Sequence, residues 1–466
     1  MPLKKIKTNT LPKAPPLKSL IGPSFIILGL GLGSGEIILW PFLSSKYGLG
    51  IIWGALVGIT LQFFMNMEIE RYALVRGESV FVGFARKMKL LPYWFLISTF
   101  LPWIWPGIAA SSAKLFGHLL GVEQTQYLAI AFLLLMGLIL SFGSVLYKTV
   151  ERMQKVLIAV GVPSIFLLSI VLAQRSDFIS LAKGMVGIGI GYSFLPIGIP
   201  IASFLAALAY AGAGGNLNLA QSFYVKDKGY GMGRYAGKIR NLLSGSSEKI
   251  DLTGSTFIVD DTSLPNFKKW WRSVNIEHLV VFWLTGSVTI LLLALLSYVT
   301  THSLGLRASD ISFVIYESAE IGRRLFPFAG TFFLIVAGAT LFGTQLTVLD
   351  ATSRILTENL SIIKDEKSGI SSRFVTKTYY SVLWLQIGAG IIIFLLGFTE
   401  PLQLLITAAV LNAFAMFVHV GLTLWLNITL LEKELKPSAL RVAAMIVAFL
   451  FYGGFSAYTI INALLS

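Results

Sequence analysis

The chain has 466 residues, of which 55% are hydrophobic and only 13% are charged, and its mean hydropathy is +0.76. This apolar content exceeds what the core of a soluble protein of this length needs, so it indicates an integral membrane protein. The absence of cysteine excludes disulfides, thiolate metal sites and thiol redox centres. No connection between the apolar segments is long enough for a soluble catalytic domain, so we expect neither enzyme activity nor a cofactor.

The chain begins with a basic, proline-rich stretch that contains KKIKTNTLPKAPP and no signal-peptide cleavage pattern. We expect residues 1–20 to form a disordered cytoplasmic tail and residues 21–466 to form one transmembrane domain. Eleven apolar segments are long enough to cross a bilayer, which takes about 20 residues a span. They lie near 22–45, 50–74, 91–120, 126–147, 154–174, 199–225, 277–301, 327–350, 375–398, 402–430 and 439–464. The Gly- and Pro-rich stretch 184–200 predicts a re-entrant or extracellular connector.

The net charge of +14 could suggest a nucleic-acid partner, but its distribution follows the predicted spans. With the N-terminus placed in the cytoplasm, 30 of the 37 Lys and Arg residues fall on the cytoplasmic side. The opposite side keeps Lys46, Lys114, Arg175, Lys183, Arg307, Arg323 and Arg324. Such an asymmetry orients membrane proteins and matches anionic lipid headgroups. We therefore expect a multi-pass protein of the cell membrane with an external C-terminus, and no nucleic-acid partner.

Two glycine-rich breaks interrupt apolar segments at matching places in the two halves of the chain. The first comprises Gly31, Gly33, Ser34 and Gly35 with Glu36 directly after them, and the second comprises Gly212, Ala213, Gly214 and Gly215 followed by Asn216. Glycine inside a helix costs about 0.5–1 kcal/mol relative to alanine, so such clusters at membrane depth need a reason. Paired breaks are typical of secondary transporters, in which discontinuous helices surround a binding site at the bilayer midplane.

The span count predicts the architecture. Five spans precede the second break and an eleventh stands apart, so we expect an all-α integral membrane protein with an inverted 5+5 repeat and broken helices one and six. Repeat one covers about 22–174, repeat two about 199–430, and an extra helix 439–464. The longest hydrophilic connection, 226–274, predicts a cytoplasmic loop.

Three stretches resemble the natural resistance-associated macrophage protein (Nramp) family of metal transporters. They are GPSFIILGLGLGSGEIILWPFLSSKYG from Gly22, LQFFMNMEIERYALVRGES from Leu61 and AGATLFGTQLTVLDATSRILTENL from Ala337. The resemblance covers most of the chain at low identity. It implies a leucine-transporter-type inverted-repeat fold and transport of a metal ion.

The family's metal-site motifs are not kept. Where the family reads Asp-Pro-Gly-Asn, this chain has Gly33 to Glu36, and where the family reads Met-Pro-His, it has Ala213 to Gly215. The acidic residues that the family places in helix three for proton passage are replaced by residues 105–109, WPGIA. Without the methionine thioether, the remaining oxygen donors suit a hard cation such as Mg²⁺ or Mn²⁺ better than Fe²⁺.

A second resemblance concerns the first break alone. Gly33-Ser34-Gly35 followed by an apolar stretch and Pro41 is similar to helix one of amino acid–polyamine–organocation transporters. In that superfamily, exposed backbone N–H groups hold a substrate carboxylate. The run 209–212, AYAG, resembles helix six of the same transporters. This resemblance implies the same fold but an amino-acid or amine substrate.

Glu36 is the first candidate site residue, because an acid inside a span is costly and usually lines a transport pathway. It would coordinate a cation or carry a coupling proton, or merely cap a half-helix. Asn216 is the second candidate metal ligand, since amide oxygens suit hard cations. Asn218 and Gln221 are weaker candidates of the same kind. With the flanking glycine backbone, the predicted substrate-binding set is Gly33, Ser34, Gly35, Glu36, Ala213, Gly214, Gly215 and Asn216.

Other polar residues inside the spans are predicted to be mainly structural. Asp350 and Arg354 have the spacing of an intrahelical ion pair. The acidic and basic residues at 68–71 read as an interfacial cluster. His419 could relay protons near neutral pH, although a hydrogen-bonded structural histidine is the simpler interpretation.

The function predicted from the sequence is secondary active transport of a hard divalent cation, with proton coupling as one form of it. One alternative is an amino-acid or amine transporter that binds its substrate at the Gly-Ser-Gly break. Another is a membrane sensor that does not transport.

Overall fold

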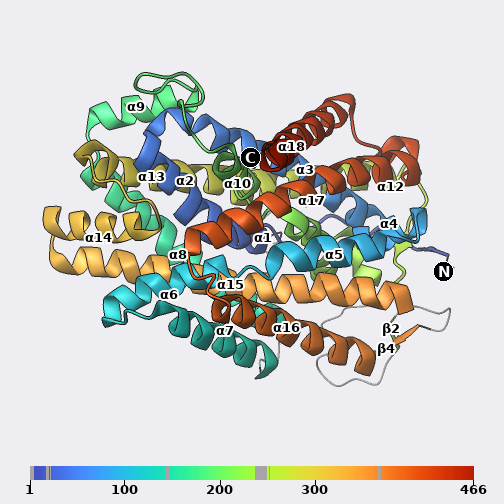
Figure 1. Ribbon diagram of the computed structural model, residues 1–466. Coiled ribbons are helices and arrows are strands. Elements are labelled where there is room, and N and C mark those ends of the chain that lie inside the picture. The colour runs from blue at the N-terminus through green and yellow to red at the C-terminus, as the bar shows by residue number, and fades with distance from the viewer. Residues whose placement is uncertain are drawn as a thin grey trace.

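The computed structural model describes residues 5–16, 20, 23–142, 146–236, 249–250, 252–364 and 369–465. Apart from four two-residue strands, its regular elements are helices, and the long helices α15, α16 and α17 run across the picture (Figure 1). The first half contains β1 (Lys7–Thr8), α1 (Pro23–Gly31), η2 (Leu32–Leu39), α2 (Trp40–Tyr47), η3 (Leu49–Ile51), α3 (Trp53–Arg76), α4 (Val80–Lys87), α5 (Leu91–Trp103), α6 (Gly107–Leu120), α7 (Thr125–Phe142), α8 (Leu146–Leu172) and α9 (Arg175–Met185).

The second half begins with the interrupted sixth span. Its elements are α10 (Ile201–Ala209), η4 (Gly215–Ala220), α11 (Gln221–Lys228), η5 (Gly231–Tyr235), β2 (Lys249–Ile250), β3 (Ser255–Thr256), α12 (Ser263–His278), η7 (Leu279–Leu284), α13 (Thr285–Thr300), η8 (His302–Leu304), α14 (Ser312–Arg324), α15 (Pro327–Lys364), β4 (Ile370–Ser371), α16 (Ser372–Leu395), α17 (Pro401–Leu430), η9 (Lys433–Leu435) and α18 (Ala439–Leu465).

Eight helices of the described chain are long and apolar enough to cross a membrane, or nine if the bent pair Ala159–Leu172 and Arg175–Met185 is one span. The predicted first and sixth spans are not among the eight, because each is divided into shorter elements. The third span is also divided: α5 ends at Trp103 and α6 begins at Gly107. Pro106 lacks a backbone N–H and disfavours helical geometry at the residue before it, which explains this interruption.

The first glycine cluster does not unwind, so the prediction of a discontinuous first helix was wrong at this position. Residues 32–39 form the π-helical segment η2, which joins α1 and α2 without a gap. The N–H of Trp40 donates to the carbonyl of Gly35, five residues back. A π-helical turn absorbs an extra residue while keeping the backbone hydrogen-bonded, and this satisfies the requirement that the hydrocarbon imposes.

The second glycine cluster does interrupt its helix, as predicted. Regular helix ends at Ala209 and resumes at Gly215 as the 3₁₀-helix η4. Gly214 and Gly215 adopt φ values of +76° and +54°, a backbone region that L side chains rarely enter. The two glycines therefore permit a chain path that no other residue type would take cheaply.

The two segments lie in the middle of the packed helices. The π-helical segment η2 packs against α10, α13 and α15, and η4 packs against α3, α5, α15 and α17. Both halves of the chain thus contribute helices to the surroundings of each segment.

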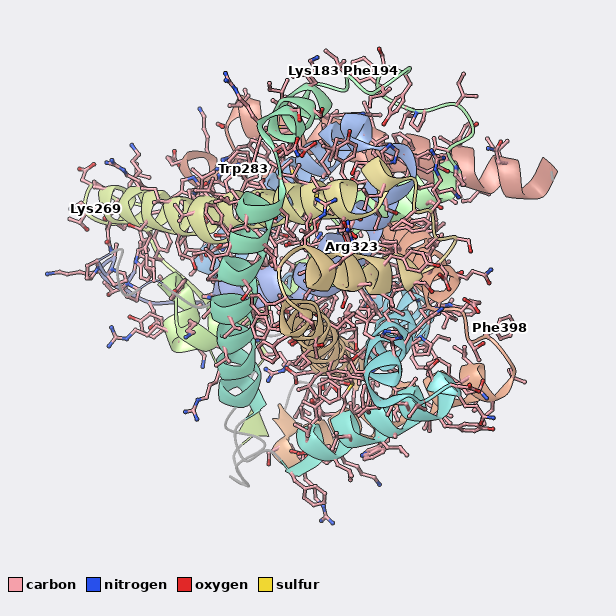
Figure 2. The ribbon with its side chains drawn as sticks, turned by 90° about the vertical axis from the view of Figure 1, so that its left-hand side faces the viewer. Lys183, Phe194, Lys269, Trp283, Arg323 and Phe398 are labelled. Atoms are coloured by element: carbon pink, nitrogen blue, oxygen red, sulfur yellow. The ribbon has the colours of Figure 1, made fainter. Side chains whose placement is uncertain are left out.

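Several of the seven basic residues expected on one side lie near one another, toward the end of the molecule where Figure 1 shows α9 and α14. Lys46, Lys183 and Arg307 line one cavity of about 430 Å³. Lys114 pairs with Asp310 at a distance of 2.5 Å. Figure 2 looks onto this end and labels Lys183 and Arg323. The N-terminus and the β2–β4 pair lie at the opposite end (Figure 1).

The N-terminal tail is ordered over much of its length, so the expectation of a disordered segment was wrong there. Strand β1 pairs in parallel with β3, with Lys7 opposite Ser255. The indole Nε1 of Trp270 donates to the carbonyl of Pro12 at 2.7 Å, and Asn266 accepts from the N–H of Ala14 at 3.0 Å. The tail is held by these partners from the 226–274 connection, which a reading of local composition cannot detect.

The ends of the molecule predict a labelling pattern. In an otherwise cysteine-free chain, Asp261→Cys should react with a membrane-impermeant maleimide only after permeabilisation, whereas Gln124→Cys should react in intact cells. Both positions are exposed, so accessibility does not limit the reaction. The reverse pattern would overturn the orientation derived from the Lys and Arg asymmetry.

Candidate functional site

The glycine face of η2 lies directly against the interruption of helix six. A Cβ on Gly31 would come within 2.8 Å of the carbonyl group of Gly212, and one on Gly35 would overlap the backbone carbonyl oxygen of Tyr210. Gly33 faces a different neighbour, the side chain of Thr344 on α15. The two glycine clusters therefore meet, as the matched positions in the sequence predicted, and the absence of side chains is what lets them approach.

Glu36 lies on η2 in an apolar environment. Its side chain is fully buried, and neither carboxylate oxygen has a hydrogen-bond partner in the described part of the chain. It faces Gly286 on α13, where an added Cβ would lie 3.5 Å from Oε1 and would also meet Ile59 and Leu28. An unpaired buried carboxylate is costly, so it needs a bound cation or a proton.

Gln62 on α3 holds the interrupted backbone of helix six in place. Its Nε2 donates to the carbonyls of Ala209 and Leu208 at 3.0 and 3.4 Å, and its Oε1 accepts from the N–H of Gly214 at 3.3 Å. These bonds satisfy backbone groups that the interruption frees. The sequence reasoning did not assign this role to Gln62.

Asn412 on α17 supports the same interruption from the other side. Its Nδ2 donates to the hydroxyl of Tyr210 at 2.9 Å, and Trp103 stacks on the Tyr210 ring with centroids 5.6 Å apart. The Oδ1 of Asn412 has no described partner and occupies the space that a Cβ on Gly215 would need. Asn412 was also missed, because its role depends on which helix it faces, and the sequence does not show this.

The amides that follow the interruption are only partly satisfied. Asn216 donates Nδ2 to Ser98 and Thr99 of α5 at 2.8 and 2.9 Å, which leaves its Oδ1 without a described partner. Asn218 makes no described side-chain hydrogen bond. The Oγ of Ser34 likewise has no described hydrogen-bond partner. Ala213 is fully buried within the interruption. The region therefore offers several neutral oxygens that lack a described hydrogen bond.

The surroundings of His419 contradict the simpler interpretation, that of a hydrogen-bonded structural histidine. It is 1% exposed on α17, and neither ring nitrogen has a hydrogen-bond partner among the described residues. The expectation of a hydrogen-bonded structural histidine was therefore wrong. No described hydrogen bond connects His419 with Glu36 or Asn216.

The predicted pair of Asp350 and Arg354 is confirmed and belongs to a larger network. Arg354 Nε lies 3.0 Å from Asp350 Oδ1, and its Nη1 lies 3.3 Å from Asp227 on α11. Tyr379 on α16 donates its hydroxyl to Asp350 at 2.8 Å. The network ties α11, α15 and α16 together in the interior, which is a structural role.

Removing the positive charge of Arg354 from this network should destabilise the fold. Arg354→Leu is expected to destabilise the protein by about 3–5 kcal/mol, since it removes the positive charge that pairs with the buried carboxylate of Asp350. The matched control is Arg323→Leu, because Arg323 also pairs with a glutamate but is 70% exposed, and exposed pairs contribute at most about 1 kcal/mol. Unfolding in detergent measures both, and equal losses would contradict a structural role for the buried network.

The acidic and basic cluster at the end of α3 divides into two parts. Glu68 pairs with Arg71 at 2.8 Å and with Arg441 at 3.3 Å, as a structural cluster should. Glu70 does not join them, because it faces Gln221. Within the described chain, this cluster included, no group of three or more His, Cys, Asp or Glu side chains is arranged to hold a metal. A metal at the interruption would therefore rely on Glu36 and neutral oxygens.

Comparison with known proteins gives matches among solved structures only: no family model matches the chain, and no curated protein matches it. A mutant of the Eremococcus coleocola manganese transporter superposes with a TM-score of 0.67 at 13% identity, over 97% of this chain and 89% of that one. The same transporter in complex with an aromatic bis-isothiourea substituted compound gives 0.61 at 14% identity, over 98% and 90%.

MhsT in complex with L-phenylalanine is also similar, with a TM-score of 0.51 at 14% identity over 94% of this chain and 98% of that one. At these identities the likeness concerns the fold. The chain has the all-α, leucine-transporter-type fold of these membrane proteins.

Proposed function

We propose that the protein is a secondary active transporter that moves a hard divalent cation, such as Mg²⁺ or Mn²⁺, by alternating access. In this proposal the cation binds where the glycine face of η2 meets the interruption of helix six. The two inverted repeats, about 22–174 and 199–430, move relative to each other around this site. The protein lies in the cell membrane with its N-terminus in the cytoplasm.

The observation that carries the proposal is the state of Glu36. It is fully buried and lacks a described hydrogen-bond partner, one residue beyond the glycine that contacts Tyr210. A carboxylate in such surroundings is stabilised by binding a positive charge. The proposed metal ligands are Glu36 and Asn216, and the substrate-binding set includes Gly33, Ser34, Gly35, Ala213, Gly214 and Gly215.

The donor chemistry supports a hard cation. A carboxylate, amide oxygens, a hydroxyl and backbone carbonyls are the ligands that Mg²⁺ and Mn²⁺ accept, and these ions keep part of their hydration shell. The solved manganese transporter with a similar fold is consistent with this cargo but does not assign it to the present chain.

The close packing at the glycines favours an ion over an organic solute. Gly31, Gly33 and Gly35 each meet a neighbour where a Cβ would lie, so little space remains beside them. The π-helical hydrogen bonds of η2 also occupy backbone N–H groups that would otherwise hold a substrate carboxylate. The likeness to MhsT would suggest the amino-acid alternative. That alternative requires open space beside the glycines and free backbone N–H groups in η2.

Proton coupling forms part of the proposal. Glu36 could hold a proton when the cation leaves, and the buried His419 is a second candidate carrier. If so, cation uptake depends on the pH gradient as well as on the cation gradient.

The test is uptake into proteoliposomes that contain the purified full chain. We expect Mn²⁺ to enter faster than into protein-free vesicles, with competition by Mg²⁺ and little competition by L-phenylalanine. Uptake of the amino acid without uptake of Mn²⁺ would contradict the cation proposal. Uptake of neither would favour the sensor alternative.

A further inference from the structure

A cavity at the end of the molecule that carries α9 is lined by basic side chains. It measures about 430 Å³ and is lined by Lys46 of α2, Lys183 of α9 and Arg307, which follows η8. Figure 2 labels Lys183 at this end. None of the residues that line the cavity in the described chain is Asp or Glu. Three positive charges from separate segments therefore share one concave space.

Contacts between distant segments form the walls of this cavity. Tyr192, in the connector between α9 and α10, donates its hydroxyl to the backbone carbonyl of Tyr47 at 2.8 Å. A Cβ on Gly50 would lie 2.3 Å from the Cα of Gly189, so these two backbones are packed closely. Helix α9 itself packs against η3 and α13. The cavity is thus a fixed feature of the fold.

The three basic side chains have no ion-pair partner among the described residues. Other basic side chains at this end do have one. Lys114 pairs with Asp310, and both Arg323 and Arg324 pair with Glu320. These acids are therefore engaged by other cations.

Lys46 lies between this cavity and a second one. The second cavity measures about 460 Å³, and Asp310 and Glu400 line it together with Lys46. The Nζ of Lys46 lies 5.6 Å from the centroid of the Tyr47 ring, and Tyr47 also lines both cavities. The acidic side chains thus belong to the second cavity, and the first keeps an unbalanced positive charge.

Such a cavity suits an anion that carries more than one charge. A concave surface with charges of one sign focuses its electric field and concentrates counter-ions. A guanidinium offers a fork of N–H donors that fits the oxygens of a phosphate group, and each ammonium adds a point charge. Lys183 and Arg307 are exposed and Lys46 is partly buried, so the cavity is accessible to an anion from solvent.

The rim of the cavity is apolar. Ile188 and Ile190 line it and are 52% and 80% exposed. A phosphate group that is attached to acyl chains would therefore find apolar contacts beside its charged partners.

We propose that this cavity binds a phosphate group, carried by inorganic phosphate or by the headgroup of an anionic lipid. Arg307, Lys183 and Lys46 contact the oxygens of this group. None of the proposed cation ligands or substrate-binding residues lines the cavity, so the site does not depend on the function proposed above.

Isothermal titration calorimetry of the purified full chain in detergent tests the proposal. Inorganic phosphate and dihexanoyl-phosphatidylglycerol are titrated at constant ionic strength, with zwitterionic dihexanoyl-phosphatidylcholine as the control. We expect saturable binding of phosphate, of phosphatidylglycerol or of both. Arg307→Gln and Lys183→Gln should each raise the Kd by about fivefold or more, since each removes a charge-assisted hydrogen bond to the anion.

The matched control is Lys269→Gln. Lys269 is an exposed lysine on α12 that lines a different cavity, next to the N-terminal tail, so its substitution should leave the Kd unchanged.

The outcomes distinguish the two sources of the phosphate group. Binding of inorganic phosphate that Arg307→Gln weakens assigns the cavity to free phosphate, and binding of phosphatidylglycerol alone assigns it to a lipid headgroup. No saturable binding of either, or an equal rise of the Kd in Lys269→Gln, would overturn the proposal. Because the measurement is binding of an anion, neither result bears on the uptake of a cation.

A cysteine at Ser180 gives a second measurement if the charge variants fail to fold. Ser180 also lines the cavity, and the chain has no native cysteine. Inorganic phosphate or phosphatidylglycerol, whichever binds in calorimetry, should slow the reaction of Ser180→Cys with a maleimide severalfold and leave that of Gln124→Cys unchanged. An unchanged rate for Ser180→Cys at saturation would contradict binding in this cavity.

Discussion

Glu36→Gln is expected to abolish Mn²⁺ uptake into proteoliposomes while the protein still folds. Glutamine keeps the size of the side chain and one acceptor oxygen but removes the charge that would hold a divalent ion. Because Glu36 is buried without a described partner, loss of its charge should not destabilise the fold. Uptake should be measured across pH, together with thermal stability.

The control for this variant is Glu317→Gln, which removes a buried glutamate away from the glycine interruption and should leave uptake unchanged. If Glu36 carries the coupling proton, the residual uptake of Glu36→Gln should also lose its dependence on pH. Uptake at the normal rate at every pH would remove Glu36 from the mechanism, and the organic-solute alternative would then move ahead.

Gly35→Ala should have the second large effect. The added Cβ would overlap the backbone carbonyl oxygen of Tyr210, and neither atom can rotate away, because the Cβ is fixed to the backbone of residue 35. Overpacking of this kind costs about 1–3 kcal/mol or more. We expect a lower thermal midpoint and Mn²⁺ uptake close to background, because η2 and the interruption of helix six must separate to accommodate the methyl group.

Gly388→Ala is the matched control for this substitution. A Cβ on Gly388, within α16, would meet nothing within 4 Å. Alanine should therefore stabilise α16 by about 0.5–1 kcal/mol through its better helix propensity, with uptake unchanged. Equal effects of the two substitutions would show that the contact between Gly35 and Tyr210 has no special importance.

The glycine cluster in helix six correctly predicted an interruption there, whereas the cluster in helix one wrongly predicted one. Gly214 and Gly215 are adjacent and both take positive φ, a backbone that only glycine adopts cheaply, so the cluster itself indicates an interruption. In helix one, the glycines serve close approach to Tyr210 and Gly212 instead. A glycine cluster is equally compatible with unwinding and with tight packing, and only the tertiary contact distinguishes them.

The candidate site shows the same limit. Glu36 and Asn216 could be proposed as candidates because they directly follow the glycine clusters. Gln62 and Asn412 could not, because each lies in a distant span and its role depends on which helix it faces. The parallel pairing of the N-terminal tail with residues 255–256 was missed for a similar reason, since a two-residue strand leaves no periodic pattern.

The most direct test of the cation site is the anomalous scattering of Mn²⁺ in crystals of the full chain. The account predicts an anomalous peak in contact with the Glu36 carboxylate, next to the place where η2 meets the interruption of helix six, and no such peak in crystals of Glu36→Gln. Well-occupied Mn²⁺ elsewhere in the protein, with none at Glu36, would contradict it.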